Sequence, residues 1–106
     1  MSQPETRLQR EIQKALKQRG AFVFKIHGSE YMVSGLPDLV VCYRGLFIGM
    51  EVKMPEGKQS ERQRYIERQV IDAGGKCRVV RSVRAALKLL DECDEQTEIP
   101  KVVRRF

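Results

Sequence analysis

Residues 35–53 read GLPDLVVCYRGLFIGMEVK, and this stretch predicts a β-hairpin at the centre of the fold. Two segments, 38–43 and 46–54, are rich in β-branched, aromatic and other apolar residues, as strands commonly are. Between them stand Arg44 and Gly45. A loop of two residues is the length that fixes the register of a hairpin most tightly. The stretch therefore predicts not only two strands but also which residues of the two strands face each other.

The predicted register brings three charged side chains together. Pairing outward from the loop sets Asp38 opposite Glu51, with the two Cβ atoms about 4.5–5.5 Å apart on one face of the sheet. Lys53 lies two residues beyond Glu51, so it points to the same face. Like charges that face each other destabilise a sheet. Some further interaction must therefore offset the repulsion between the two carboxylates.

Apart from these charges, both faces of the hairpin are apolar. One face carries Leu39, Val41, Tyr43, Leu46, Ile48, Met50 and Val52, and the charged face also carries Val40, Cys42 and Phe47. We therefore expect helices to cover both faces. Carboxylates at one end of such a sheet would lie in a cleft, where leaving them without a partner costs free energy.

Two interpretations account for the charges. In the first, Lys53 forms a structural salt bridge with one of the acids. In the second, Asp38, Glu51 and the backbone carbonyl of Val52 hold a hard divalent cation, with water molecules completing an octahedron. Lys53 would then orient and help to deprotonate an attacking water, or stabilise negative charge on a scissile phosphate. Hydrolysis of a phosphodiester needs this combination of groups.

The rest of the chain predicts elements that surround the hairpin. Apolar side chains at helical spacing predict helices, and short β-rich segments predict strands. The predicted elements are a helix over 5–20, a strand over 21–27, the two hairpin strands, a helix over 61–75, a strand over 76–80 and a helix over 82–93. The order α-β-β-β-α-β-α is typical of an α/β fold with a mixed central sheet flanked by helices. We expect one domain over 1–93, followed by a tail or arm over 94–106.

The composition suits one small domain with a polyanionic partner. The chain has 106 residues, 42% of them hydrophobic, which matches a single modest core. Lys and Arg number 20 against 14 Asp and Glu, and the net charge of +6 favours binding to nucleic acid, although solubility alone also explains it. No apolar run reaches the length of a membrane span, and the first residues lack a signal-peptide pattern, so we expect an intracellular protein.

The cysteines and the histidine argue against a zinc site. Cys42, Cys77 and Cys93 are odd in number and lack the CxxC spacing of metal fingers, and the chain has one histidine. Reduced thiols with a structural role are the expected state in an intracellular protein.

The motifs of the hairpin resemble those of a known family. Pro37-Asp38 followed by Glu51-Val52-Lys53 matches the PD-(D/E)XK nuclease motif, and G-L-P-D followed by G-x-x-x-x-M-E-V-K resembles the VRR-NUC (virus-type replication-repair nuclease) family. Ser60-x-x-Gln63 at the start of the next helix extends the resemblance, which spans roughly residues 5–90. The resemblance implies a restriction-endonuclease-like core, dependence on Mg²⁺ or Mn²⁺, and cleavage of DNA, often branched DNA.

The family also carries an acidic residue on its first helix, and the chain offers two candidates. Glu5 lies near the middle of the apolar stripe of that helix, whereas Glu11 lies toward its edge. We therefore assign Glu5, which the resemblance implies would reach the metal through a water molecule. An ordinary carboxylate in the first turn, favoured by the helix dipole, is the alternative.

Gln63 shares a side of its helix with the apolar Ile66 and Val70. A polar side chain in such a place needs a partner. It matches the helix glutamine of the family and would orient Lys53 or a metal-bound water, while a plain hydrogen bond in the core is the alternative.

Four basic residues flank the predicted cleft, and for each of them a solvated charge is the alternative to a contact with the DNA backbone. They are Lys25, Lys58, Arg62 and Arg64.

The leading hypothesis is a metal-dependent DNA endonuclease that selects branched DNA such as Holliday junctions. Family nucleases that stand alone resemble Holliday-junction resolvases, so we expect a homodimer, with the apolar residues of the first helix and Val102-Val103 as candidate interface. The alternatives are a non-catalytic nucleic-acid-binding module with the same fold and a domain that binds only proteins.

Overall fold

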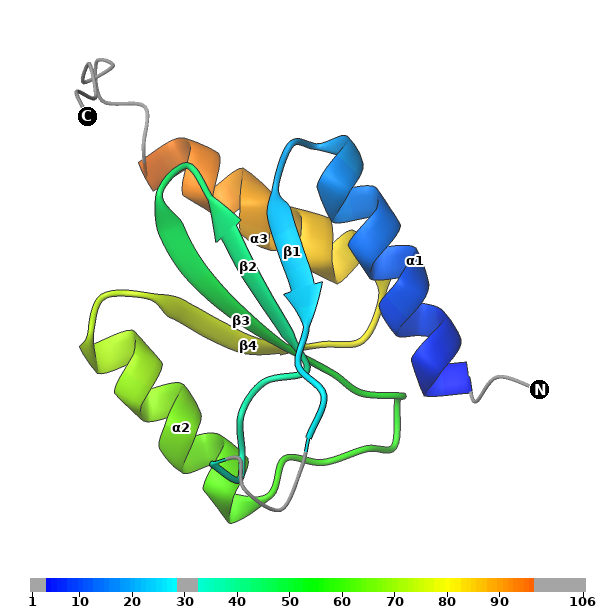
Figure 1. Ribbon diagram of the computed structural model, residues 1–106, viewed down its shortest axis with the longest axis vertical. Helices are drawn as coiled ribbons and strands as arrows, with labels where there is room; N and C mark the ends of the chain where they lie inside the picture. Colours follow the sequence, from blue (N-terminus) through cyan, green and yellow to red (C-terminus); the bar gives the residue numbers. More distant parts are fainter. Residues whose placement is uncertain (1–3, 29–32, 97–106) are drawn as a thin grey trace.

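The computed structural model describes residues 4–28 and 33–96 (Figure 1). Its elements are α1 (Pro4–Gln18), β1 (Phe22–Lys25), β2 (Leu39–Tyr43), β3 (Leu46–Val52), α2 (Glu61–Asp72), β4 (Lys76–Val80) and α3 (Val83–Gln96). The strands form one mixed sheet in the order β1-β2-β3-β4, with β3 and β4 parallel and the other pairs antiparallel. The predicted order of elements and the predicted fold class are both confirmed.

The register of the β2–β3 hairpin is also confirmed. Tyr43 pairs with Leu46, and the pairing continues outward to Leu39 and Met50. Arg44 and Gly45 have φ angles of 53° and 80°, and two positive φ angles in a two-residue loop match the twist of the flanking strands. Strand β2 begins at Leu39, one residue after the predicted start, so the predicted pairing of Asp38 with Glu51 lies just beyond the last observed pair.

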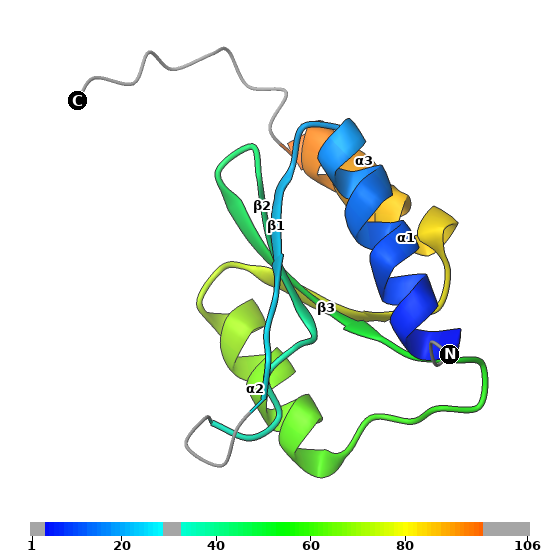
Figure 2. The same ribbon diagram turned by 45° about the vertical axis from the view of Figure 1, so that its right-hand side comes forward.

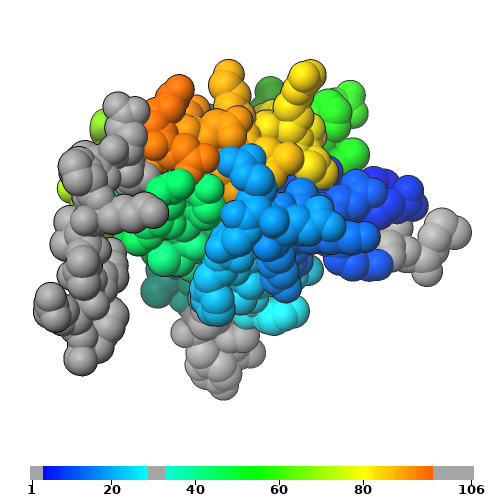
Figure 3. Space-filling view, turned by 90° about the horizontal axis from the view of Figure 1, so that it is seen from above, coloured from blue at the N-terminus to red at the C-terminus, as the bar shows by residue number. Residues whose placement is uncertain are grey.

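Two layers of helices cover the sheet unequally. Helices α1 and α3 pack side by side on one face (Figures 2 and 3), and α2 lies on the other (Figure 2). The core between the sheet and the first layer is fully buried and includes Ile12, Leu16, Leu39, Val41, Ile48, Met50, Val52, Leu89 and Leu90. The apolar residues of the first helix therefore belong to the core, and their assignment to a dimer interface was wrong.

The face toward α2 is only partly covered, which corrects the expectation that helices enclose both faces. Phe22, Phe24 and Phe47 are 65%, 46% and 43% exposed, and Cys42 on the same face is exposed as well. The reason is geometric, because α2 packs against β4 and leaves the part of the face formed by β1 and β2 open. We call Phe22, Phe24, Cys42 and Phe47 the open aromatic face.

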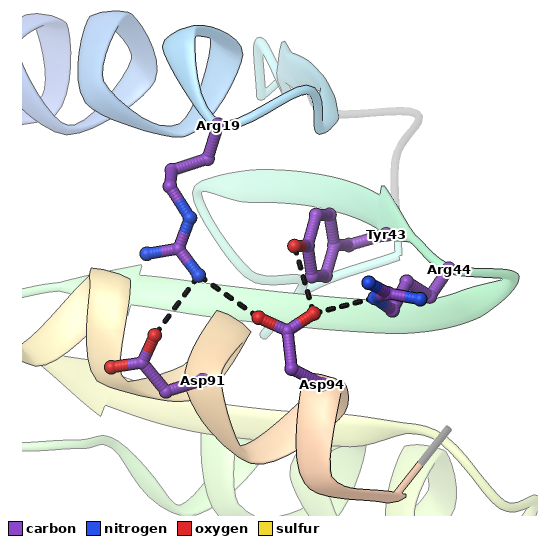
Figure 4. A network of polar contacts seen from close by, with 5 residues as sticks. All are labelled: Arg19, Tyr43, Arg44, Asp91 and Asp94. Carbon is purple, nitrogen blue, oxygen red and sulfur yellow. Dashed lines mark hydrogen bonds and ion pairs between the residues drawn. The ribbon is translucent and has the colours of Figure 1, made fainter. Parts of the chain in front are cut away.

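Helix α3 continues to Gln96, three residues beyond the predicted end at Cys93, and the extra turn has polar contacts. Asp94 accepts hydrogen bonds from the Tyr43 hydroxyl (2.9 Å), from Arg44 and from Arg19 (3.1 Å), and Arg19 also contacts Asp91 (2.9 Å) (Figure 4). These five residues, which we call the hairpin-tip network, join the ends of α1 and α3 to the tip of the β2–β3 hairpin. Most of the predicted tail, 97–106, lies outside the described residues.

All three helices begin at the end of the sheet opposite the tip of the β2–β3 hairpin. Strands β1, β3 and β4 end there and β2 begins there, as the pairings Lys25–Leu39, Leu39–Met50 and Val52–Val80 show. The chain reverses direction after α1 to enter β1 and after α2 to enter β4, so both helices begin where those strands end. Helix α3 follows the end of β4, so all three helices begin at this end of the sheet. We call it the motif end, because the Pro-Asp and Glu-Val-Lys steps both lie there. In the described residues, no helix is long and apolar enough to cross a membrane.

Candidate active site

Asp38 is held at the motif end by contacts on both sides. Its backbone carbonyl accepts a hydrogen bond from the Ile26 amide (2.8 Å), and its Oδ2 atom accepts one from the Val52 amide (2.8 Å). The second bond ties the Pro-Asp step directly to the Glu-Val-Lys step across the hairpin. A carboxylate that accepts a backbone N–H has a fixed position, so Asp38 is anchored and not a freely moving surface acid.

The residues that precede Asp38 explain the rest of the G-L-P-D motif. Gly35 has a φ of +87°, and a Cβ atom there would lie 2.5 Å from the backbone oxygen of Arg62. Only glycine combines this backbone conformation with so close an approach to the start of α2. Pro37 is buried and packs on Gly49 of β3. The motif thus anchors one loop to both α2 and the sheet, and it delivers Asp38 at the junction.

Glu51 is the one fully buried acid among the described residues, with an exposed fraction of 0%. Its Oε1 atom accepts a hydrogen bond from Gln59 Nε2 (2.8 Å), whereas Oε2 has no hydrogen-bond partner in the described part of the chain. Burial raises the pKa of Glu51 above its ordinary value, and the nearby carboxylates of Glu67 and Asp38 add to the rise. A buried carboxylate oxygen without a partner is costly in a folded protein unless a ligand completes the site.

Lys53 follows β3 on the same side and is half-buried. Its positive charge lowers the pKa of Glu51, but it forms no ion pair within residues 4–28 and 33–96. The structural salt bridge considered from the sequence is therefore not seen there. The Lys53 side chain instead lies beside Gly57. If Gly57 carried a Cβ atom, that atom would be 3.3 Å from both Cβ and Cδ of Lys53.

The loop that follows Lys53 is anchored by a residue that the sequence did not indicate. The Arg81 guanidinium donates to the carbonyl oxygens of Met54 (2.7 Å), Pro55 (3.3 Å) and Gly57 (2.9 Å). Arg81 follows β4 directly, beside the end of β3. Three carbonyl contacts to one planar donor group fix the conformation of the loop.

Two more polar residues of the site were missed. Gln59 Nε2 donates both to Glu51 and to Glu67 Oε1 of α2, at 2.8 Å and 2.7 Å. Neither residue belongs to the family motif, and Gln59 lies just before the helix, where no periodicity applies. The sequence signal for Gln59 is the density of polar residues between Lys53 and α2, whereas Glu67 reads as an ordinary polar residue of that helix.

Glu5 lies in the first turn of α1 and is half-buried, whereas Glu11 is exposed. The choice between them agrees with this burial, and α1 begins at the motif end. Gln9, one turn after Glu5, is 94% buried, and its Oε1 atom has no hydrogen-bond partner in the described part. The proposed contact of Glu5 with a metal through water stays a prediction.

The structure places the oxygen of Gln63 at the N-terminus of α2. Its side-chain Oε1 atom accepts a hydrogen bond from the backbone amide of Ser60 (2.9 Å). The backbone amide of Gln63 in turn donates to Ser60 Oγ (3.1 Å). These reciprocal bonds form a capping box, which the Ser60-x-x-Gln63 pattern could have predicted. The glutamine that contacts Glu51 is Gln59, and the proposed orienting role of Gln63 stays a prediction.

The four basic residues assigned to the DNA backbone differ in their surroundings. Lys25, at the end of β1, is half-buried, and Lys58 and Arg64 are exposed. Arg62 is exposed but partly engaged, because its Nε donates to Ser34 Oγ (3.0 Å) and its guanidinium stacks 5.0 Å from the centre of the Tyr65 ring. Contacts of these residues with DNA stay predictions.

The buried thiols have structural surroundings. Cys77 on β4 and Cys93 on α3 are buried, and burial together with the charges of Glu51 and Glu67 raises the pKa of Cys77 to about 12. A thiol with this pKa is protonated at neutral pH and is a poor nucleophile or metal ligand.

The chemistry of the site fits a hard divalent cation. Asp38 and Glu51 could supply oxygen ligands, and the Oε2 atom of buried Glu51, which has no hydrogen-bond partner in the described residues, is an acceptor open to a cation. The described residues contain no group of three or more His, Cys, Asp and Glu side chains placed to bind a metal. A backbone carbonyl, water and substrate oxygens would therefore have to complete the coordination, as is usual for Mg²⁺.

The mixed sheet with this helix arrangement, and with a Pro-Asp step beside a Glu-Val-Lys step, matches a nuclease-like fold. One of the solved structures that match, described as a VRR_NUC domain, aligns with a TM-score of 0.71 and 28% sequence identity. The alignment covers 85% of this chain and 97% of that one. Neither a scan of protein-family models nor a search of the curated proteins gives a match. The resemblance to VRR-NUC domains is thus confirmed by the structural match.

Proposed function

We propose that this protein is a Mg²⁺- or Mn²⁺-dependent DNA endonuclease. The observation that carries the proposal is the buried Glu51 carboxylate, which has one oxygen without a partner among the described residues and lies beside anchored Asp38 and Lys53 in a VRR-NUC-like fold. Asp38, Glu51 and the carbonyl of Val52 would hold the metal, with Glu5 acting through water. The bound metal would act as a Lewis acid toward the scissile phosphate.

The residues around the metal site have separate tasks. Lys53 is half-buried and forms no ion pair with a described residue, so its ammonium is available to orient the attacking water or to stabilise charge on the phosphate. The hydrogen bond from the Val52 amide holds Asp38 in place. Arg81 holds the loop after Lys53, which limits where the ammonium can lie.

DNA is the proposed substrate on electrostatic grounds. The chain carries a net charge of +6, and three helices begin at the motif end, where their dipoles present partial positive charge. Lys25, Lys58, Arg62 and Arg64 are the candidate contacts to the backbone. Selection of branched DNA such as Holliday junctions is the expected preference.

A homodimer is the proposed assembly, since two sites related by a two-fold axis would cut paired strands. The open aromatic face offers a surface for it, because exposed aromatic side chains clustered on one side of a protein commonly mark an interface. This surface replaces the first helix as the candidate interface, and Val102-Val103, the other candidate, lies outside the described residues.

The test is cleavage by a Glu51→Gln variant, which keeps the size of the side chain and an oxygen that can accept from Gln59. Four-way junction, flap and linear duplex DNA are incubated with Mg²⁺ or Mn²⁺ and the products are separated on gels. We expect metal-dependent cleavage by the wild type, fastest on the four-way junction, and none by the variant. Glu56→Gln, an exposed acid in the loop after Lys53, is the matched control and should cleave normally.

The same experiment separates the alternatives. A non-catalytic module of this fold would bind DNA without cutting it in either metal, and a protein-interaction domain would do neither. Full activity of Glu51→Gln would contradict the assignment of the metal site.

A further inference from the structure

Gln59 contacts two acids with a single nitrogen. Its Nε2 atom lies 2.8 Å from Glu51 Oε1 and 2.7 Å from Glu67 Oε1. A carboxamide nitrogen carries two hydrogens, so these two bonds use its whole donor capacity. Glu67 comes from α2 and Glu51 from β3, so the amide also links the helix to the sheet.

The two carboxylates decide how the amide is turned. Ionised carboxylates only accept hydrogen bonds, and a flipped amide would place its oxygen against two acceptors. The nitrogen must therefore face the acids. A Gln59 with one carboxylate neighbour would be held by one bond, whereas the second bond, which Gln59 donates to Glu67, fixes the direction in which Gln59 meets Glu51.

The consequence appears at the other oxygen of Glu51. With Oε1 held by Gln59, the carboxylate plane is set and Oε2 is left buried and without a partner in the described residues. Substitution of a residue that orients a metal ligand in this way commonly weakens metal binding by about 10- to 100-fold.

We infer that Gln59 and Glu67 are positioning residues that hold Glu51 with its Oε2 atom turned toward the metal. The inference rests on the proposed function, because it needs Glu51 to be a metal ligand. Glu67 acts through Gln59 and not as a ligand itself. Its contribution therefore depends on accepting a hydrogen bond more than on its charge.

The test is titration of the full chain with Mn²⁺ alone, with the free ion measured by electron paramagnetic resonance. Gln59→Leu removes the donor while keeping the bulk of the side chain, and we expect its dissociation constant to rise by roughly 10- to 100-fold. Glu67→Leu removes the acceptor and should raise the constant about tenfold, whereas Glu67→Gln keeps an acceptor oxygen and should stay within about twofold of wild type.

The controls separate positioning from charge and from folding. Glu61→Gln removes an exposed acid from the first turn of the same helix and should bind Mn²⁺ as the wild type does. Equal weakening in Glu67→Gln and Glu67→Leu would mean that charge alone matters and would overturn the inference. Circular dichroism melting of the metal-free variants reports their folding, and a lower melting temperature with unchanged Mn²⁺ affinity would overturn it as well.

Failure of this inference is distinguishable from failure of the proposed function. If the wild type binds no Mn²⁺, or Glu51→Gln binds it equally well, both fail together. If binding requires Glu51 but Gln59→Leu has the wild-type dissociation constant, only the positioning role is wrong.

Discussion

Gly49 lies directly against Pro37, because a Cβ atom on Gly49 would be 2.8 Å from Pro37 Cγ and 3.1 Å from Cys77 Sγ. The absence of a side chain at Gly49 therefore lets Pro37 of the Pro-Asp step pack directly on the strand. Glycine in a strand commonly marks such a close approach.

Gly49→Ala should displace Pro37 and destabilise the fold by about 1–3 kcal/mol, the usual cost of an added methyl in a packed site. We also expect slower DNA cleavage, because Asp38 follows Pro37. Urea unfolding measures the stability. Gly28→Ala is the matched control, since a Cβ atom there meets nothing within 4 Å, and equal stability of the two variants would contradict the packing role.

Glu51→Gln should stabilise the metal-free protein while it abolishes cleavage. The wild-type carboxylate is buried and its pKa is raised by desolvation, so a neutral side chain of the same shape avoids that burial cost. In the presence of a chelator we expect a gain of about 0.5–2 kcal/mol in the free energy of unfolding, the usual range for such substitutions. A loss of stability would show that Glu51 contributes to the fold without a metal.

Arg81→Met should loosen the loop after Lys53. Hydrogen exchange at the Gly57 amide, which donates to Met54 O (2.9 Å), is expected to speed up, and cleavage to fall about tenfold because Lys53 is less well placed. Arg84→Met removes an exposed charge from α3 and serves as the control. Unchanged exchange at Gly57 in Arg81→Met would show that the loop holds its shape without the guanidinium.

The stability that Asp94 and Glu92 contribute to the fold should be lost in acid, whereas protonation of buried Glu51 acts in the opposite direction. The hydroxyl of Tyr43 and the guanidinium of Arg44 lower the pKa of Asp94 below its ordinary 3.8, and Arg78 lowers the pKa of Glu92 below 4.5. Such carboxylates stabilise the fold above their unfolded pKa, and the unfolded chain binds more protons as the pH falls. The melting temperature should therefore decrease as the pH falls from about 4.5 through the lowered values.

Asp94→Asn provides the check on this pH dependence. The variant should melt lower than wild type at neutral pH and show a shallower decrease in acid. Glu95→Gln, at an exposed position one residue further on, should follow the wild-type curve. Parallel curves for wild type and Asp94→Asn would place the acid sensitivity elsewhere.

The open aromatic face predicts the assembly state. Phe22→Ser combined with Phe24→Ser should convert the proposed dimer to a monomer in sedimentation equilibrium. Ile71→Ser, which changes a side chain of similar exposure on α2, should leave the dimer intact. A wild type that sediments as a monomer would contradict the proposal directly.

The hairpin was predictable because its information is local. Arg44 and Gly45 fix the register, and the register places Asp38 opposite Glu51 whatever the rest of the chain does. The contacts of Gln59 and Glu67 were not predictable in this way, because they depend on how α2 lies over the sheet. The same tertiary detail explains why the open aromatic face was expected to be covered: apolar alternation shows which side chains share a face, but not how far a helix extends across it.

The hairpin-tip network lies at the far end of the sheet from the Pro-Asp and Glu-Val-Lys steps. Its ion pairs fasten the ends of α1 and α3 to the tip of the hairpin without using any residue of the candidate site. The loop after Lys53 can therefore vary in sequence while these contacts hold the other end of the sheet together. For protein engineering, this makes 54–58 the segment to vary when a different substrate preference is wanted, with Gln59 kept because it contacts Glu51.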